Sequence, residues 1–350
     1  MENARTYERY LRNKWVFMIG LIVCVVLFSV FAICVGSAGL NLNQIFRTIV
    51  GMGSNQSEII LFNIRLPRVV TAVVAGIGLA GVGCVMQALL KNPLASASTL
   101  GIAQGAAFGA SFAIIVLGAG LQSQTIDSIT ISNPYTVSLC AFVSAMISTI
   151  MILGLSQFRK VTPESMILSG VALSTMFGGA TTLLQYFAAD VKVAAVVFWT
   201  FGDLGRTGWR EILVMSVVVA VALIFFLLNR WNFNALQHGE ETAKSLGVHV
   251  KRLRMAGMFV SSLTAATIVS YIGIINFIGL IAPHLVRRFV GNDYRYLLPA
   301  SALTGALLLL VSDVIARLVV APIILPIGAI TSFLGAPLFL YLLFKGVGSR

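Results

Sequence analysis

Long apolar segments alternate with short polar ones along almost the whole chain of 350 residues. A helix needs about 20 apolar residues to cross a bilayer, and inside lipid it must satisfy its own backbone hydrogen bonds. The pattern therefore predicts a bundle of about ten membrane-spanning helices. The expected spans are residues 15–35, 69–90, 99–121, 135–155, 165–187, 211–230, 255–275, 297–320 and 327–345, with a shorter tenth segment at 276–290 that Pro283 breaks.

Composition agrees with an all-α polytopic membrane protein. The chain is 58% hydrophobic and 10% charged, whereas soluble domains carry about 25% charged residues. The alternating pattern of a membrane β-barrel is absent. No linker or low-complexity tract interrupts the chain, so we expect a single transmembrane domain over residues 1–350. The first apolar run is longer than the about 7–15 residues of a signal-peptide core, which favours a retained span.

The basic residues predict the orientation of the helices. The formal net charge is +12. With the N-terminus in the cytoplasm, 17 of the 24 lysines and arginines fall on the cytoplasmic side, as the positive-inside rule requires. We therefore expect a multi-pass protein of the cell membrane, plasma or inner, with both termini in the cytoplasm. The semi-apolar segment 191–210 is expected to form an interfacial or re-entrant turn rather than a span.

A polar island at residues 237–247 separates two long apolar segments on this cytoplasmic side. It predicts one or two short helical turns with paired acids and a glycine at each end. In a chain with so few charges, this grouping indicates a docking site for a soluble partner, within a segment of about 231–254. The candidate docking residues are Gly239, Glu240, Glu241, Ala243, Leu246 and Gly247.

Small and polar residues recur at helical spacing along the span 165–187. The stripe is compatible with close helix packing or with the wall of a translocation path, and the sequence does not choose between them. Its members are Gly170, Ser174, Gly178, Thr182 and Gln185.

Motifs for nucleotide chemistry and metal binding are missing or out of context. No Gly-x-x-x-x-Gly-Lys-Ser/Thr loop is present. The string Gly76-Ile-Gly78-Leu-Ala-Gly81 matches a dinucleotide fingerprint but lies inside a predicted span and follows no strand. Asp313 is the acid deep within a span, and its spacing to Arg317 predicts a local ion pair. We expect no cofactor, metal, enzymatic activity or nucleic-acid partner.

Three arginines lie at span ends on the predicted outer side, where basic residues should be scarce: Arg65, Arg68 and Arg317. They could reach toward lipid phosphates or form a docking surface for an acidic partner.

The ordered set of motifs resembles the permease subunits of ABC importers for ferric siderophores, haem and cobalamin, the FecCD or BtuC type. The resemblance covers nearly the whole chain. It rests on Arg65-Leu-Pro-Arg68, Gly83-x-x-x-Gln87, Asn92-Pro-Leu-Ala95, Leu100-Gly101, Leu168-x-Gly170-x-Ala172, the island from Gly239 to Gly247, Phe277-Ile-Gly279 with Pro283-His284, Leu297-Leu-Pro299-x-Ser301-Ala302, Asp313-x-x-x-Arg317, Leu325-Pro326-x-Gly328 and Gly335-Ala-Pro337.

The resemblance implies a type II importer fold of ten helices, two permease subunits around a central path, and a pair of cytoplasmic ATPases. It also implies an extracytoplasmic substrate-binding protein. By this resemblance the island around Glu240 and Glu241 couples to the ATPase, and Arg65, Arg68 and Arg317 meet acidic residues of the binding protein. The helix from Gly170 to Gln185 resembles the one that lines the path. Ile324 departs from the family pattern, which often has an acid there.

We expect from this an importer subunit that moves an iron–siderophore complex inward, with haem or a corrinoid as the next substrates. The alternative from another class is an ion-coupled secondary transporter, although such proteins normally carry more than one membrane-embedded charged site.

Overall fold

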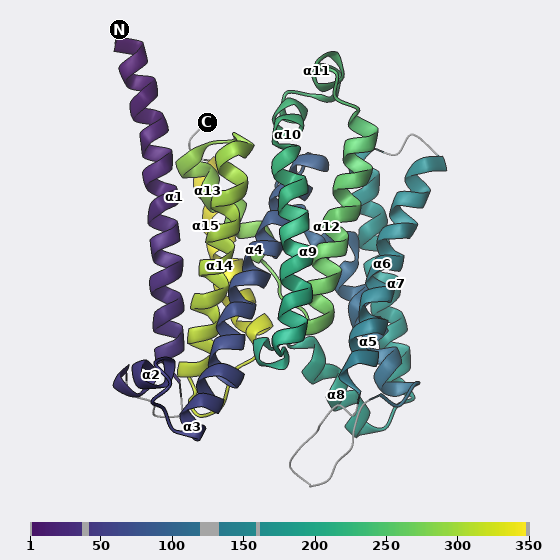
Figure 1. Cartoon of the computed structure of the whole chain (residues 1–350). Coiled ribbons are helices and arrows are strands. Elements are labelled where there is room, and N and C mark those ends of the chain that lie inside the picture. Colours follow the sequence, from purple (N-terminus) through teal and green to yellow (C-terminus); the bar gives the residue numbers. More distant parts are fainter. Residues whose placement is uncertain (1, 37–41, 120–132, 159–161, 348–350) are drawn as a thin grey trace.

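The computed structural model describes residues 2–36, 42–119, 133–158 and 162–347, and these residues form helices and connecting turns without a strand. The long helices stand side by side in a bundle (Figure 1). The expected all-α polytopic fold is confirmed. The long helices are α1 (Glu2–Cys34), α4 (Leu66–Leu89), α6 (Pro134–Phe158), α7 (Pro163–Tyr186), α9 (Trp209–Leu228), α12 (Val250–Ile272), α14 (Tyr294–Leu318) and α15 (Ile327–Val347).

Seven helical segments in the described chain are long and apolar enough to cross a membrane. The segment expected at 99–121 forms a shorter helix, α5 (Ile102–Ile115), after the 3₁₀ turn η2 (Ala97–Leu100). Gly101 and Gly118 have φ values of 75° and 66°, which L side chains rarely adopt, and these glycines lie just outside the two ends of α5.

The prediction that Pro283 breaks the segment 276–290 was wrong. Helix α13 (Ile278–Val290) contains Pro283 and continues past it. A proline removes one backbone hydrogen bond, and a helix packed among neighbours tolerates that loss. Both α4 and α14 pack against α13 and enclose it.

Helix α4 is the central helix of the bundle, with 78% of its most apolar window buried. A Cβ added to Gly76 would lie 2.5 Å from the carbonyl oxygen of Gly305 in α14. A Cβ on Gly83 would lie 1.8 Å from the carbonyl oxygen of Gly279 in α13. Glycine is therefore required for these close approaches between helices. The string Gly76–Gly81 lies inside α4, as expected, and not between a strand and a helix as a dinucleotide fingerprint would.

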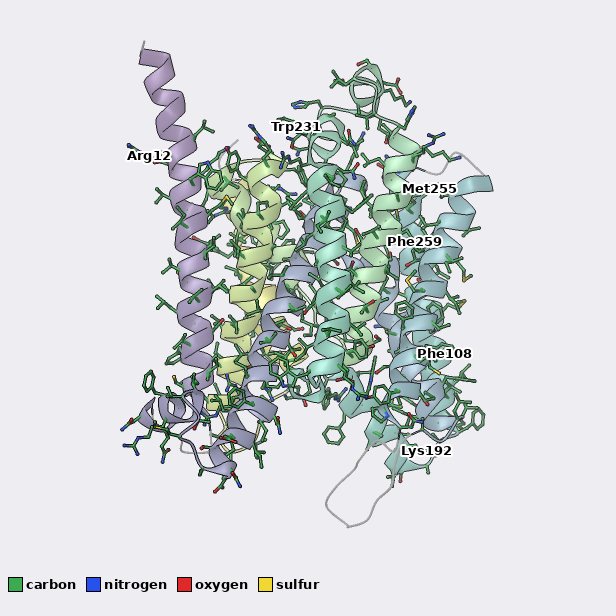
Figure 2. The ribbon with its side chains drawn as sticks, in the orientation of Figure 1. Arg12, Phe108, Lys192, Trp231, Met255 and Phe259 are labelled. Atoms are coloured by element: carbon green, nitrogen blue, oxygen red, sulfur yellow. The ribbon has the colours of Figure 1, made fainter. Side chains whose placement is uncertain are left out.

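Short helices gather at the two ends of the bundle (Figure 1). One end, here called the α8 end, holds α2 (Leu42–Ile49), α3 (Asn55–Glu58), the π-helical turn η1 (Ile59–Arg65), α8 (Asp190–Thr200) and η3 (Leu204–Arg206). The opposite α11 end holds α10 (Arg230–Gln237) and α11 (Glu240–Ser245), together with the beginning of α1. Because α8 and η3 are too short to span a membrane, the expectation that residues 191–210 do not form a span is confirmed. Their place at the membrane interface stays a prediction. Figure 2 places Trp231 toward the α11 end and Lys192 toward the α8 end.

A buried carboxylate ties the helices together at the α8 end. Asp313 is 0% exposed, and its two oxygens lie 2.7 Å from Nε of Arg68 and 2.9 Å from Nε of Arg317. The expected Asp313–Arg317 pair is thus confirmed, and Arg68 of α4 joins it. Arg317 also donates to the carbonyls of Ala32 and Val35 at the end of α1. We call Arg68, Asp313 and Arg317 the arginine clasp.

Replacement of Asp313 by Asn should destabilise the protein strongly. The change leaves two guanidinium groups, each less than 10% exposed, without their carboxylate. Breaking a buried pair in this way costs about 3–5 kcal/mol. The measurement is thermal unfolding in detergent. Asp190→Asn, at the exposed start of α8, serves as control and should cost less than about 1 kcal/mol. Equal effects of the two changes would refute the clasp as a stabilising element.

Candidate functional site

Within the polar island, Glu240–Ser245 folds as one short helix, α11, as the sequence predicts. Helix α10 precedes the island and ends at its first residue, Gln237. Gly239 precedes α11 with a φ of 113°, and Gly247 follows it with a φ of 83°. These left-handed values favour glycine and allow the chain to turn sharply on both sides of a six-residue helix. Helices α10 and α11 together project at the α11 end (Figure 1), and we call residues 230–247 the knob.

The knob is fixed to the bundle by buried side chains and by hydrogen bonds to the start of α14. Phe233, Leu236 and Ala243 are each 0% exposed. Nδ2 of Asn234 donates to Oδ1 of Asp293 at 2.9 Å. Ala243 is therefore an anchor of the knob, and its side chain is not available to a partner.

The two acids of the island have different surroundings. Glu240 forms a short ion pair with Arg254 of α12 and lies 3.6 Å from Nζ of Lys91. Glu241 pairs with Lys244 in its own helix, and its side chain is 87% exposed. Glu240 therefore holds the knob to the bundle, whereas Glu241 faces outward.

Glu240 also connects the knob to the end of the central helix. Nε of Arg254 donates to the carbonyl of Leu89, the last residue of α4, at 3.1 Å. Partial burial acts to raise the pKa of Glu240, but the hydrogen bonds and charges of Arg254 and Lys91 outweigh it and hold that pKa below its usual value. The sequence analysis missed both basic partners because each is distant in sequence from Glu240 and belongs to no local motif.

The outward surface of the knob also contains an exposed apolar side chain. Leu246 is 67% exposed at the end of α11. Gly247 follows it, and a Cβ there would meet no atom within 4 Å. Burial of this exposed leucine in a groove of another protein would remove its apolar surface from water, which is favourable.

The stripe on α7 divides into a packed part and an open part. A Cβ on Gly170 would lie 2.1 Å from the carbonyl oxygen of Thr99, so this position is a packing contact with η2. Ser174 is half-buried. A Cβ on Gly178 would meet no atom within 4 Å, and Thr182 is exposed while Gln185 is half-buried. Close packing therefore accounts for Gly170, and the rest of the stripe leaves room along α7.

Helix α7 has little cover within this chain. Only 17% of its most apolar window is buried. Leu168, Leu183 and Tyr186 are 71%, 64% and 80% exposed. Lipid or another protein chain is needed to cover this apolar surface.

The three arginines of the predicted outer side are brought together but are mostly covered. Arg65, Arg68 and Arg317 are 5%, 7% and 9% exposed. Nη1 of Arg65 donates to the carbonyls of Ile33 and Cys34, at 2.8 and 3.1 Å. Nη1 of Arg68 also lies 3.5 Å from Asp203, whose side chain is 41% exposed. Neither lipid anchoring nor docking accounts for these contacts, which bind one part of the chain to another.

Comparisons with known proteins agree with this architecture. The model of the FecCD transport family matches residues 22–345. An ABC transporter permease of Methanocaldococcus jannaschii is 50% identical over 345 residues, which are 99% of each chain. A hemin transport system permease of Yersinia pestis is 37% identical over 315 residues, which are 89% of this chain and 92% of that one.

A solved structure has the same fold. It is described as an inward-facing conformation of a metal-chelate type ABC transporter, and it superimposes with a TM-score of 0.82 at 31% sequence identity. The match covers 94% of this chain and 98% of that one. Together with the family match, these findings show that the chain belongs to the FecCD transport family and is an ABC transporter permease with an importer permease fold.

Proposed function

We propose that the chain moves an iron–siderophore complex inward across the cell membrane, using ATP that a separate subunit hydrolyses. The support for a chelated metal is the 31% identical structure described as a metal-chelate type transporter. Haem and cobalamin are the next candidates, and the hemin permease of Yersinia pestis supports the first of them. In this proposal both termini and the knob face the cytoplasm.

The observation that carries the proposal is the rigid knob with an exposed acid and an exposed leucine. Its base is locked to α4, α12 and α14, so a force applied to Leu246 or Glu241 reaches the long helices directly. Loosely held loops would absorb such a movement. We propose that an ATPase dimer docks on this knob through Gly239, Glu241, Leu246 and Gly247, and that Ala243 and Glu240 hold the knob in shape.

A second permease subunit would cover α7. The exposed apolar surface of α7 and the open positions at Gly178 and Thr182 suit a path between two chains. We propose that Ser174, Gly178, Thr182 and Gln185 face this path, and that Gly170 fixes the helix behind it.

A substrate-binding protein would dock at the α8 end. We propose that Arg65, Arg68 and Arg317 belong to that surface, with the half-exposed Asp203 beside them. A carboxylate of the partner would have to exchange with the present carboxylate and carbonyl partners. Charge reversal of all three arginines would break the clasp as well, so it does not isolate docking.

Energy coupling tests the proposed function. In proteoliposomes that contain the chain, its ATPase and its binding protein, uptake of a radiolabelled iron–siderophore complex should require ATP and should persist with a proton or sodium ionophore. Uptake that the ionophore abolishes and that ATP depletion leaves intact would instead support the ion-coupled transporter.

The two acids of the knob should respond differently to replacement. Glu241→Lys should weaken ATPase association and uptake while thermal stability stays within about 0.5 kcal/mol, because the side chain is exposed. Glu240→Lys should reduce both stability and association, because it places a cation between Lys91 and Arg254. The measurements are co-purification of the ATPase, uptake and thermal unfolding. Normal association and uptake in Glu241→Lys would remove this residue from the docking surface.

Bulk at the open part of the α7 stripe should block transport without unfolding the bundle. Thr182→Trp should reduce uptake at least about tenfold while the complex assembles and hydrolyses ATP, since an indole occupies space that the substrate needs. Val217→Trp, at a 56% exposed position of α9, is the matched control and should transport normally. Failure of Thr182→Trp to assemble would show that this face packs against a protein chain.

A further inference from the structure

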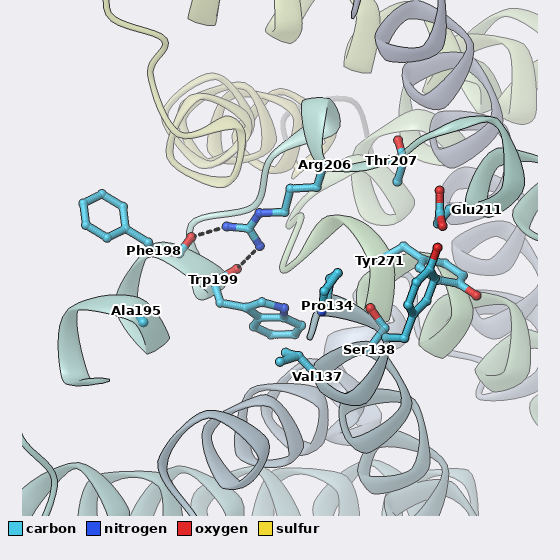
Figure 3. A pocket seen from close by; sticks show the side chains of 11 residues that line it. Pro134, Val137, Ser138, Ala195, Phe198, Trp199, Arg206, Thr207, Glu211 and Tyr271 are labelled. Atoms are coloured by element: carbon cyan, nitrogen blue, oxygen red, sulfur yellow. Dashed lines mark hydrogen bonds between the residues drawn. The ribbon is translucent and has the colours of Figure 1, made fainter. Parts of the chain in front are cut away.

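A cavity of about 590 Å³ lies at the α8 end, within a single chain and separate from the α7 stripe. It is enclosed by the starts of α6 and α9, the end of α12, and the α8–η3 segment (Figure 3). Trp199 and Val137 form a buried floor at 2% and 1% exposure. The side chains of Tyr135 and Phe198 line the cavity and are 61% and 56% exposed, so its rim opens to the surroundings.

A guanidinium and a carboxylate both line this cavity. Arg206 donates through Nη1 to the carbonyl of Trp199 and through Nη2 to that of Phe198, at 3.2 and 2.6 Å. Glu211 accepts from the backbone N–H of Gly208 at 2.8 Å. These contacts fix both side chains, since they close the ends of α8 and α9. Figure 3 shows Arg206 directed toward Phe198 and Trp199, with Glu211 near Tyr271 on the other side.

Both charged groups keep unused hydrogen-bonding capacity. A guanidinium has five N–H donors and a carboxylate can accept about four hydrogen bonds. Within the described part of the chain, neither Arg206 nor Glu211 forms an ion pair. Partly buried charges are costly unless they are paired. The nearby carboxylate of Asp203 acts on Arg206 but lies 3.5 Å from Arg68, so it is shared between two guanidinium groups. A ligand with a negative and a positive group would satisfy both.

The walls between the two charges are aromatic. Trp199, Tyr135 and Tyr271 all line the cavity. An ammonium group is attracted to the faces of such rings, and most strongly to tryptophan. Together with Glu211, these rings suit an organic ammonium, whereas Arg206 suits a phosphate.

An exposed apolar stripe leads away from the rim. It starts at Tyr135, a wall of the cavity, and continues at every fourth residue of α6 through Leu139, Val143 and Ile147. These four side chains are 61%, 62%, 47% and 44% exposed. Residues at this spacing share one face of a helix, so an acyl chain could lie along α6 while its headgroup enters the cavity.

We propose that this cavity binds the headgroup of a zwitterionic phospholipid with an ammonium group, such as phosphatidylethanolamine. Arg206 contacts the phosphate, Glu211 and the aromatic rings contact the ammonium, and the α6 stripe supports an acyl chain. The site is independent of the proposed transport function, because none of these residues belongs to the knob or to the α7 stripe.

Native mass spectrometry of the delipidated full-length protein tests the site. Phosphatidylethanolamine and phosphatidylglycerol with identical acyl chains are titrated in parallel, since the second lacks the ammonium. Wild type should bind phosphatidylethanolamine at least about tenfold more tightly, as expected for one charge-assisted contact. Glu211→Gln keeps an acceptor for Gly208 and should reduce this preference to less than about threefold.

Two further variants make the result decisive. Ser138→Phe fills the cavity without changing its charge and should weaken the binding of both lipids. This variant tests the site even if Glu211→Gln does not fold. Glu58→Gln removes an exposed acid at the same end, outside the cavity, and should retain the wild-type preference. Equal affinities of wild type for the two lipids would overturn the proposal, as would an unchanged preference in Glu211→Gln or undiminished lipid binding in Ser138→Phe. Equal competition by free glycerophosphoethanolamine would show a soluble zwitterion site and would overturn the assignment to lipid.

Discussion

The carboxylate of Asp313 is the constraint on which the α8 end of the molecule depends. A charge without access to water must find an opposite charge within the protein, and Asp313 finds two, from α4 and from its own helix. Arg317 and Arg65 in turn donate to the last carbonyls of α1, which a helix leaves without partners. The requirement to neutralise one buried acid thus sets the relative positions of α1, α4 and α14.

Helix α4 connects the arginine clasp to the opposite end of the molecule. Its glycines meet the backbones of α13 and α14 so closely that a single added carbon would collide. At its far end, the carbonyl of Leu89 accepts from Arg254, which also holds Glu240 of the knob. Protein contacts therefore run without interruption from the arginine clasp to the knob. Such a chain of packed and hydrogen-bonded groups is a physical route by which the two ends can be coupled.

Much of this architecture could be predicted from sequence because it follows from local patterns. The length and hydropathy of each segment predicted the helices, and a polar island with glycines near its ends predicted the short helix α11. The Asp313–Arg317 pair followed from helical spacing. The partners of Arg68 and Glu240 could not be found in this way, because contacts such as Arg68–Asp313 join residues 245 positions apart. The helix through Pro283 could not be predicted either, because the packing that compensates for a proline is a tertiary feature.

The same limit applies to the candidate sites. The sequence could identify Glu240 and Glu241 as a pair, but their opposite surroundings depend on where α12 and Lys91 lie. Likewise, the stripe on α7 has uniform spacing in sequence, yet Gly170 packs against η2 and Thr182 does not. The charges at Arg206 and Glu211 carried no sequence signal, because each also serves as an ordinary helix-end contact.

In the proposed orientation the knob faces the cytoplasm, where ATP is available, and the α8 end faces outward. Accessibility of single cysteines tests it most directly, in a chain whose four native cysteines are replaced. Leu246→Cys on the knob and Phe46→Cys at the α8 end are both highly exposed positions. A membrane-impermeant maleimide should label Phe46→Cys in right-side-out vesicles and Leu246→Cys in inverted ones. The reverse pattern would contradict the orientation and, with it, the proposal that energy enters through the knob.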